Sequence, residues 1–550
     1  MIGRSIFYMV VVFAGMMLQT ALHAADALPP VVYDVRAFGA AGDGKTLDSA
    51  AINKAIDAAN SAGGGTVFFP AGTYLSFSIH LKSNVCLWLD QAATILAAEN
   101  PLDPNAPGYD APEPNEWDPY EDFGHSHWHN SLIWGEDLEN ISIVGMGRID
   151  GKGLSRGGNP RRNRSSTEPE IAPNPELPKN LPATRSKFGY PSARDTLPAG
   201  IGNKAIALKL CRNVTFKDFT IYRGGHFGIL ATGVDNWTLS NIKIDTNRDG
   251  VDIDCCRNVR MSDCSVNSPS DDGICPKSTF ALGENRPCEN ITITNCQVSG
   301  WVMGSFLDGT YKKSEKGPGT GRIKFGTESN GGFKNITISN CVFAYCRGLA
   351  LETVDGALLE DVTIDNITMR DIGNSPIFLR LGARLRGPDG TKVGTLRRVK
   401  ISNIVCYDAS AKYSSIISGI PDGVIEDVTL SNIRIYAKGG GTKEQATSRP
   451  AEKENTYPEP TMFGTTPSYG FYVRHVKGIE FRDVEVSTID PDARPAFVMD
   501  DVSDVEMNHV KAQHPVDAPS YLLRNVTNFS TFHCPQMKDQ TREKVEQEQF

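Results

Sequence analysis

The sequence predicts an all-β protein built as a parallel β-helix, a solenoid of stacked coils, with a helix capping its N-terminal end. One phrase recurs: Asn or Asp, an apolar and usually β-branched residue, a polar residue, an apolar residue and a polar pair. It begins at Asn140, Asn213, Asn236, Asn258, Asn290, Asn335, Asp361 and Asp427. Alternation of this kind is typical of a short strand with one buried face. Helical periodicity is absent from this region.

The spacing of the phrases favours a solenoid over the alternative, a β-sandwich. The clearest intervals are 23 residues, from 213 to 236, and 22 residues, from 236 to 258. Such repeats suit coils that bury their inward faces against their neighbours. A sandwich would place strands roughly every 8 to 12 residues and join them by hairpins.

Residues 1–24 have the pattern of a secretory signal, with one positive charge at Arg4, an apolar run and a small-residue exit near Ala24. The segment holds no Cys, so a lipid anchor is not expected. No later apolar run approaches the roughly 20 residues of a membrane span. We therefore expect a secreted or periplasmic protein with no membrane partner.

The stretch TLDSAAINKAIDAAN, residues 46–60, predicts the capping helix. One helical face carries Ile52, Ala55, Ile56 and Ala59. Because a solenoid needs its open end covered, we expect this helix to close the N-terminal coil. The following GGGTVFFPAGTY begins the first coils.

Residues 25–534 are expected to form a single parallel β-helix domain. Segments rich in Pro, Asn, Gly or charged residues and without periodicity predict long loops at 100–130, 153–200, 303–320 and 437–468. Loops on a rigid scaffold commonly form the walls of binding sites. Residues 535–550 are expected to be a charged, solvated tail.

The register assigns three of the twelve cysteines to the core. Cys264, Cys296 and Cys341 lie six positions after their phrases begin, where other coils have Phe or Ile. Free Cys behaves as a small buried hydrophobe. Six more are possible disulfide partners in an exported protein: Cys255, Cys256, Cys275, Cys288, Cys346 and Cys534.

The formal net charge of -9 argues against nucleic acid as a partner. It does not exclude an acidic sugar polymer, because the charge of a groove can oppose the overall sign. We expect the chain to act as a monomer.

Carboxylates recur at one position of the coil. His226, Asp249 and Asp271 each lie 13 residues after the start of a phrase. In-register stacking would form a column with neighbours roughly 4.8 Å apart, and Asp272 would lie beside it. Like charges this close raise the pKa of one group, so that one carboxyl can hold a proton while its neighbour is ionised. The pair then supplies both an acid and a base. Inverting glycosidases use such a set, in which one carboxylic acid protonates the leaving oxygen and another carboxylate activates water.

A doublet at a bend, where strict alternation fails, could present both Asp271 and Asp272 to one cleft. Plainer interpretations exist. Asp-Gly pairs, as at 249 and 272, are common in turns. Asp252 and Asp254 fit a solvated strand face, and His226 fits a structural histidine.

At these residues the sequence resembles the polygalacturonase family, family 28 of the glycoside hydrolases, from FGAAGDGKTLDSAAINKAI to about residue 435. The Asn-Thr-Asp-Gly motif of that family resembles NRDGVDID, in which Asn247 and Asp249 match and Arg248 replaces Thr. Its Asp-Asp motif matches Asp271-Asp272 in SDDGICPKS. The resemblance implies a right-handed parallel β-helix and inverting hydrolysis of a pectic polysaccharide. Asp271 would be the general acid, Asp249 and Asp272 would hold the attacking water, and no metal or organic cofactor would take part.

Two departures from the family point to the substrate. The family's Gly-His-Gly is replaced by Gly-Thr-Gly at 319–321, and its Arg-Ile-Lys by Ala-Leu-Glu at 350–352. The literal Arg-Ile-Lys at 322–324 lies one coil earlier, where its charges can still line the cleft. Arg and Lys at the usual places bind the carboxylate of galacturonate. Because rhamnogalacturonan-acting members also depart from both motifs, we expect a similarity to them or to atypical bacterial members, and a rhamnogalacturonan or rhamnose-containing pectic substrate.

The candidate substrate-binding residues are Asn247, His226, Lys277, Arg322, Lys324, Glu352 and Arg380. Glu352 can accept hydrogen bonds from neutral sugar hydroxyls, or simply be exposed. Arg380 and Arg384 are candidates for gripping an acidic sugar; the alternative is ordinary surface charge.

The stretch GHSHWHN places His125, His127 and His129 on one face if it is extended. Such a set can ligate a metal, but no accompanying Cys or carboxylate spacing supports that interpretation. A sugar-contacting loop in which Trp128 stacks on a sugar ring is favoured over it.

Three other functions remain open. The chain could be a plain polygalacturonase, a calcium-dependent pectate lyase on the same fold, or a non-catalytic carbohydrate-binding β-helix protein. A lyase would need carboxylates for Ca²⁺, and its activity would not survive a chelator.

Overall fold

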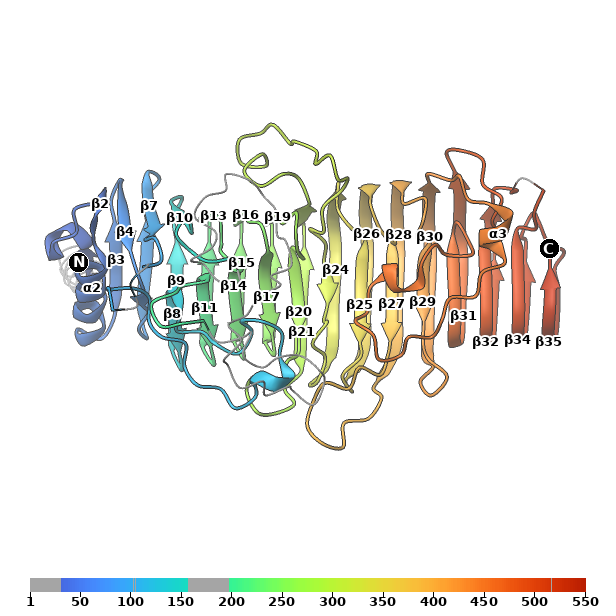
Figure 1. Ribbon diagram of the computed structural model, residues 1–550, viewed down its shortest axis with the longest axis horizontal. Coiled ribbons are helices and arrows are strands. Elements are labelled where there is room, and N and C mark those ends of the chain that lie inside the picture. Colours follow the sequence, from blue (N-terminus) through green and yellow to red (C-terminus); the bar gives the residue numbers. More distant parts are fainter. Residues whose placement is uncertain (1–30, 102, 104, 157–196, 516) are drawn as a thin grey trace, which may run out of the picture.

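The computed structural model describes residues 31–101, 103, 105–156, 197–515 and 517–550 and forms one long parallel β-helix. Figure 1 shows the strands side by side in chain order from the N-terminal to the C-terminal end. Within these residues, each pairing between named strands is parallel except that of β34 with β35. The prediction of an all-β parallel β-helix is confirmed. The predicted signal, residues 1–24, and most of the predicted loop at 153–200 lie outside the described residues.

The coils stack into three faces. The first face is built mainly from β1 (Val32–Asp34), β3 (Gly65–Phe69), β6 (Val85–Leu89), β9 (Glu139–Val144), β12 (Arg212–Lys217), β15 (Asp235–Ser240), β18 (Arg257–Ser262) and β21 (Cys288–Thr294). The second is built from β2 (Asp43–Leu47), β4 (Gly72–Ser76), β7 (Ala93–Ala97), β10 (Arg148–Asp150), β13 (Thr220–Tyr222), β16 (Lys243–Asp245), β19 (Ser265–Asn267) and β22 (Gln297–Ser299). The third is built from β5 (Ile79–His80), β8 (Ser131–Glu136), β11 (Lys204–Lys209), β14 (Phe227–Thr232), β17 (Asp249–Asp254), β20 (Ile274–Lys277), β23 (Lys324–Phe325), β25 (Leu349–Thr353), β27 (Ile377–Leu381) and β29 (Ser415–Ser418).

Toward the C-terminal end, longer strands run through more than one face. They are β24 (Phe333–Ala344), β26 (Leu358–Ile372), β28 (Thr395–Ala409), β30 (Ile425–Ala437), β31 (Phe471–Thr488), β32 (Phe497–Asn508), β34 (Tyr521–Phe532) and β35 (Gln540–Gln549). The short β33 (Lys511–Ala512) pairs with β31. The described residues also contain helical elements: η1 (Val35–Phe38), α2 (Ser49–Ser61), η2 (Asp118–Tyr120), α3 (Lys443–Ala446) and η5 (Pro460–Phe463).

Helix α2 covers the N-terminal end of the solenoid, as predicted (Figure 1). Its buried residues are the four named from the sequence: Ile52, Ala55, Ile56 and Ala59. They join the single main core that runs along the interior of the coils. This helix shields the inward faces of the first strands from water.

The recurring phrase has a backbone cause. Asn213, Asn236 and Asn258 each have φ of 56°, a left-handed conformation that Asn tolerates better than most residues. Their side chains form a ladder, in which Asn236 Nδ2 donates to Asn213 Oδ1 (3.1 Å) and Asn258 Nδ2 to Asn236 Oδ1 (3.3 Å). The left-handed residue turns the chain into the first face, and the amide ladder holds one coil on the next.

Eleven of the twelve cysteines are buried, and none is cross-linked. Cys264, Cys296 and Cys341 are buried, which confirms their predicted core position. All twelve cysteines are free, so the six suggested as disulfide partners form no disulfide. The five of these six that lie between 255 and 346 are fully buried. Cys256, Cys288 and Cys346 belong to the apolar core, whereas Cys255 and Cys275 lie against Asp254 and Asp249 on the outer side of the third face.

Other predicted segments have these outcomes. Residues 303–320 form no strand, and after Ala437, the last residue of β30, the predicted loop to residue 468 contains only the short α3 and η5. Residues 535–550, set apart as a charged tail, include strand β35, which is mostly exposed but pairs with β34 and buries Val545. Among the described residues, none of the helices has the length and apolarity needed to cross a membrane.

Candidate active site

The candidate site lies on the outer side of the third face, at β17, β20, β23 and β25. In β17, Val251 and Ile253 belong to the core, so the strand alternation directs Asp252 and Asp254 outward. Both are nevertheless fully buried, because loops cover this part of the face. The interpretation of Asp252 and Asp254 as a solvated strand face is therefore wrong.

The expected column of His226, Asp249 and Asp271 is shifted by one residue on each side of Asp249. Asp249 pairs with Phe227 of β14. Because Val251 lies opposite Ile274, the register continues to Asp272 opposite Asp249. The sequence count assumed that each stacked residue follows the start of its phrase by 13 residues, whereas Phe227 and Asp272, which lie opposite Asp249, follow theirs by 14.

Glycines beside these acids let the strands approach closely. A Cβ atom on Gly250 would lie 2.3 Å from the carbonyl oxygen of Gly273, and one on Gly228 would lie 2.5 Å from that of Gly250. No other residue fits at either position unless a neighbouring strand moves. The pair Asp249-Gly250 lies inside β17, so its glycine serves strand packing rather than a turn.

Asp249 is buried at the start of β17. Burial, followed by the charges of Asp271 and Asp252, raises its pKa well above the usual range. One of its carboxylate oxygens lies within 4.8 Å of an oxygen of Asp272. Asp249 is therefore suited to hold a proton at pH values where an exposed aspartate is ionised.

Asp272 is also buried, but it is surrounded by cations. Arg322 Nε donates to its Oδ1 (2.8 Å), and Lys324 Nζ lies 3.5 Å from its Oδ2. Burial alone would raise the pKa of Asp272, but the charges of Arg322 and Lys324 outweigh it and lower the pKa well below the usual range. Two neighbouring carboxyls thus have opposite protonation tendencies.

Asp271 is the most exposed of the three acids, with a side chain that is 26% exposed. It lies in the bend before β20 and accepts a hydrogen bond from the Asp272 amide (3.0 Å). Arg248 Nη2 lies 2.7 Å from its Oδ2. The predicted bend is thus present, and it directs Asp271 toward solvent while Asp272 turns inward.

Asn247 and His226 flank the acids. Asn247 is buried and accepts a hydrogen bond from Ser270 Oγ (2.8 Å), which ties the bend before β17 to the bend before β20. His226 Nδ1 donates to the Arg156 carbonyl (3.0 Å). Burial, and then the charge of Arg248, lower the pKa of His226 well below its usual value, so its imidazole is neutral.

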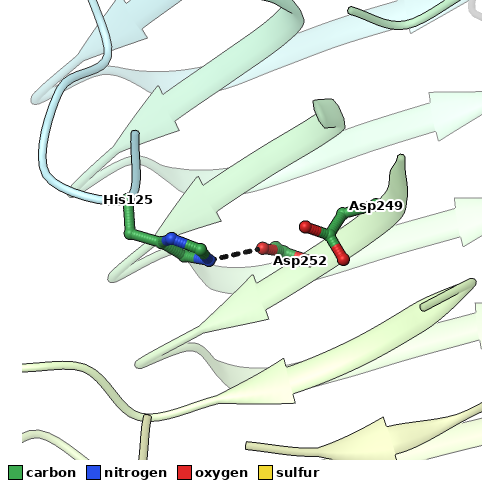
Figure 2. A group of neighbouring side chains, drawn as sticks. All are labelled: His125, Asp249 and Asp252. Atoms are coloured by element: carbon green, nitrogen blue, oxygen red, sulfur yellow. Dashed lines mark ion pairs between the residues drawn. The ribbon is translucent and has the colours of Figure 1, made fainter. Parts of the chain in front are cut away.

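A second polar group adjoins Asp249. Figure 2 shows His125 reaching from its loop toward Asp252, with Asp249 beside it; His125 Nε2 lies 3.2 Å from Asp252 Oδ2. Burial and the charge of Lys277 lower the pKa of His125, but Asp252 and Glu328 outweigh them and raise it. Sequence reasoning missed this contact, because the two residues lie on segments far apart in the chain.

Two groups of side chains in the described residues have the spacing to hold a metal ion: His125 with Asp249 and Asp252, and Asp249 with Asp272 and Cys275. Lys277 is buried beside Asp249 and Asp252 and interacts with both charges, and its Nζ lies 3.1 Å from Glu328 Oε2. This ammonium already offsets negative charge there, so neither group requires a cation for balance.

Glu352 is fully buried, with neither carboxylate oxygen in a hydrogen bond. Lys324 Nζ lies 3.6 Å from its Oε2. Burial raises the pKa of Glu352 to about 8, although Lys324 opposes the shift. The suggestion that Glu352 is simply exposed is wrong.

Arg380 and Arg384 direct their guanidinium groups toward the protein. Arg380 is buried and donates to Ser418 Oγ (2.9 Å) and to the carbonyls of Gly419 (2.9 Å) and Glu452 (3.0 Å). Arg384 Nε donates to Asp355 (2.9 Å). The alternative of ordinary surface charge is wrong for both, because these donors brace loops over the third face.

The three neighbouring histidines diverge rather than share one face. His125 approaches Asp252, His127 Nδ1 donates to the Glu113 carbonyl (2.7 Å), and His129 Nε2 bonds Glu136 (2.7 Å). Their segment forms turns instead of a strand, so they do not bind one metal together. Trp128 is fully buried, so its predicted stacking on a sugar is wrong.

A loop residue missed from the sequence completes the site. Glu459, between β30 and β31, forms an ion pair with Arg322 and lies 3.1 Å from Arg347 Nη1. The loop was predicted as a wall of the site, but nothing in its sequence indicated which side chain reaches the acids.

Comparisons with known proteins support the fold. The family described as "Rhamnogalacturonase A/epimerase, pectate lyase-like" matches residues 32–100, and "Right handed beta helix region" matches residues 199–314. A solved family 28 exopolygalacturonase from Yersinia enterocolitica superposes with a TM-score of 0.61 at 21% identity, covering 87% of this chain and 78% of that one.

Two curated proteins are similar in sequence. An exo-poly-alpha-D-galacturonosidase from Dickeya chrysanthemi is 25% identical over 66% of this chain, and this chain spans 59% of its length. A probable polygalacturonase from Vitis vinifera is 22% identical over 79% of this chain and 80% of its own.

Proposed function

We propose that this protein is an inverting glycoside hydrolase that cleaves a pectic polysaccharide or oligosaccharide. One observation carries the proposal: Asp249 and Asp272 on neighbouring coils are close together but have opposite pKa shifts, and Asp271 lies beside them at the surface. Inverting hydrolysis requires a base for water and a separate acid for the leaving group. The sequence similarity to polygalacturonases supports the same reaction.

The three acids take different roles. Asp271, the solvent-facing carboxyl, donates a proton to the glycosidic oxygen as that bond breaks. Asp272, kept ionised by Arg322 and Lys324, accepts the proton that water loses as its oxygen bonds to the anomeric carbon. Asp249 holds that water beside Asp272. Solvent then reprotonates Asp271 and removes the proton from Asp272, which restores the starting state.

The favoured substrate is rhamnogalacturonan or another rhamnose-containing pectic glycan. Glu352 takes the place where the resembling family has a cation for galacturonate, and Arg322 and Lys324 are paired with the protein's own carboxylates. A plain exo-polygalacturonase is the second candidate, favoured by the similarity to the Dickeya chrysanthemi protein.

Product analysis tests the reaction. The purified protein is incubated with polygalacturonan, rhamnogalacturonan and their oligomers, and the anomeric configuration of the first product is followed by NMR. Inversion supports the proposal; retention, an unsaturated product or the absence of cleavage overturns it. Asp271→Asn should lower kcat/KM by about 10²- to 10⁴-fold, whereas Asp57→Asn, at an exposed position of α2, should leave it unchanged.

We also propose that residues 1–24 direct export to the periplasm or the exterior. Expression of the full chain in a bacterial host should yield an exported protein whose N-terminus, measured by mass spectrometry, lies near residue 25. An uncleaved protein retained in the cytoplasm would contradict this.

A further inference from the structure

A carboxylate of the protein occupies a site built to bind a carboxylate. Glu459 is held by donors from three successive turns of the solenoid. Its carboxylate pairs with Arg322, lies 3.1 Å from Arg347 Nη1 and accepts from Asn374 Nδ2 at 3.4 Å. Two guanidinium groups converging on one carboxylate form the arrangement that proteins use to bind acidic ligands.

This site adjoins the catalytic acids. Arg322, which binds Glu459, also donates from Nε to Asp272 Oδ1 (2.8 Å), so one guanidinium separates the two carboxylates. Arg322 is 1% exposed, whereas the side chain of Arg347 is 34% exposed. Of these two guanidinium groups, that of Arg347 is therefore the one that solvent reaches.

The loop holds Glu459 in place. Pro458 and Pro460 flank it and restrict the backbone on both sides. Met462 and Phe463 follow and pack on the third face against Phe378, Ile416 and Tyr472. Burial would raise the pKa of Glu459, but Arg322 and Arg347 outweigh it and lower the pKa, so the carboxylate stays ionised.

We propose that Glu459 substitutes for a sugar carboxylate and thereby makes the subsite beside Asp272 selective for an uncharged sugar. The proposal rests on the proposed function in that it assumes a pectic ligand at this site. A uronate entering here would bring its charge against Glu459 and find both guanidinium groups already paired. A neutral sugar meets no such repulsion. Removing the Glu459 carboxylate should free Arg322 and Arg347 to bind the carboxylate of an acidic sugar.

Binding of monosaccharides tests this without requiring turnover. D-galacturonate and D-galactose are titrated by calorimetry into wild type, Glu459→Ala and Glu454→Ala, the last removing a glutamate from the same loop. We expect Glu459→Ala to bind D-galacturonate about tenfold more tightly than wild type, with galactose binding unchanged. Glu454→Ala should behave as wild type, and Arg347→Ala added to Glu459→Ala should abolish the gain.

Several outcomes would overturn the proposal: wild type binding D-galacturonate as tightly as Glu459→Ala, an equal gain in Glu454→Ala, or a gain that survives loss of Arg347. If Glu459→Ala folds poorly, its thermal midpoint in acetate against chloride gives a second readout. Acetate should raise the thermal midpoint of Glu459→Ala but not that of wild type. Equal shifts in the two proteins would contradict the proposed role of Glu459. Binding is measured independently of hydrolysis. If Glu459→Ala binds D-galacturonate more tightly but the protein cleaves no pectic glycan, the inference about Glu459 stands and only the proposed function is rejected.

Discussion

Glu352 couples the protonation of the site to folding stability. Its pKa in the folded protein is about 8, against an ordinary value of 4.5. The folded state therefore keeps a proton that the unfolded chain releases between these values. The stabilising contribution of Glu352 is complete below the lower value and is lost as pH rises through the upper one; each unit of difference corresponds to about 1.4 kcal/mol.

Replacing Glu352 by Gln should remove this pH dependence. Gln cannot ionise, so the free energy of unfolding of Glu352→Gln should rise relative to that of wild type between about pH 5 and about pH 9. Denaturant unfolding across that range measures it. Glu426→Gln, at a partly exposed position of the first face, is the control. A constant difference between wild type and Glu352→Gln would show that this carboxyl does not hold its proton.

Arg322 sets the protonation of Asp272. Its guanidinium is the largest influence lowering the pKa of that carboxyl. Arg322→Gln should therefore raise the pKa of Asp272 and move the acid limb of the kcat/KM profile to higher pH, while Arg322→Lys keeps the charge and should move it less. The pH profiles of the three proteins on a pectic oligomer provide the test. An acid limb unchanged in Arg322→Gln would remove Asp272 from the role of base.

The sequence identified the acids but not their environment. Asp249, Asp271 and Asp272 were found because a doublet and a recurring spacing are visible in one dimension. The one-residue shift in register could not be predicted in this way, because the position of a residue along its coil depends on how many residues the preceding bend contains. His125, which lies near Asp249, and Glu459, which pairs with Arg322, come from distant segments and reach the site only when loops fold over the third face.

At the level of the strands, the feature most readily recognised from the sequence is the asparagine that begins each phrase and has a left-handed backbone conformation. Asn236 combines a φ of 56° with ladder contacts to Asn213 and Asn258. Asn236→Ala loses both the ladder and the tolerated conformation, whereas Asn236→Gly loses only the ladder. Because a residue with a Cβ costs roughly 1 to 2 kcal/mol in this conformation, Asn236→Ala should be the less stable variant.

The urea midpoint measures the difference in stability between the two variants. Hydrogen exchange in β12, β15 and β18 shows whether the difference is confined to the strands of the asparagine ladder. Faster exchange confined to these strands is expected in Asn236→Ala. Equal exchange in the Ala and Gly variants would assign the role of Asn236 to its side-chain ladder alone. The loops are the opposite case, since residues 303–320 and 437–468 have no periodicity from which an atomic position can be argued.

Across the whole molecule, stacking replaces cross-linking as the source of stability. Phe471, Phe497 and Tyr521 stack on successive coils with ring centroids 5.4 and 5.3 Å apart. The buried Cys264, Cys296 and Cys341 occupy equivalent positions of three earlier coils. Each coil therefore gains its stability from its two neighbours. Nothing in this arrangement depends on an oxidised cysteine.

A thiol count tests that conclusion. Because all twelve cysteines are free, the denatured protein should react with twelve equivalents of a thiol reagent without prior reduction. The folded protein should react mainly at Cys86, the one that is not buried, since burial also raises the pKa of buried thiols such as Cys288 and keeps them unreactive. A reductant should leave the thermal midpoint unchanged. A lower count that reductant restores to twelve would reveal a disulfide, and a lowered midpoint under reduction would mean that the stability of the fold depends on it.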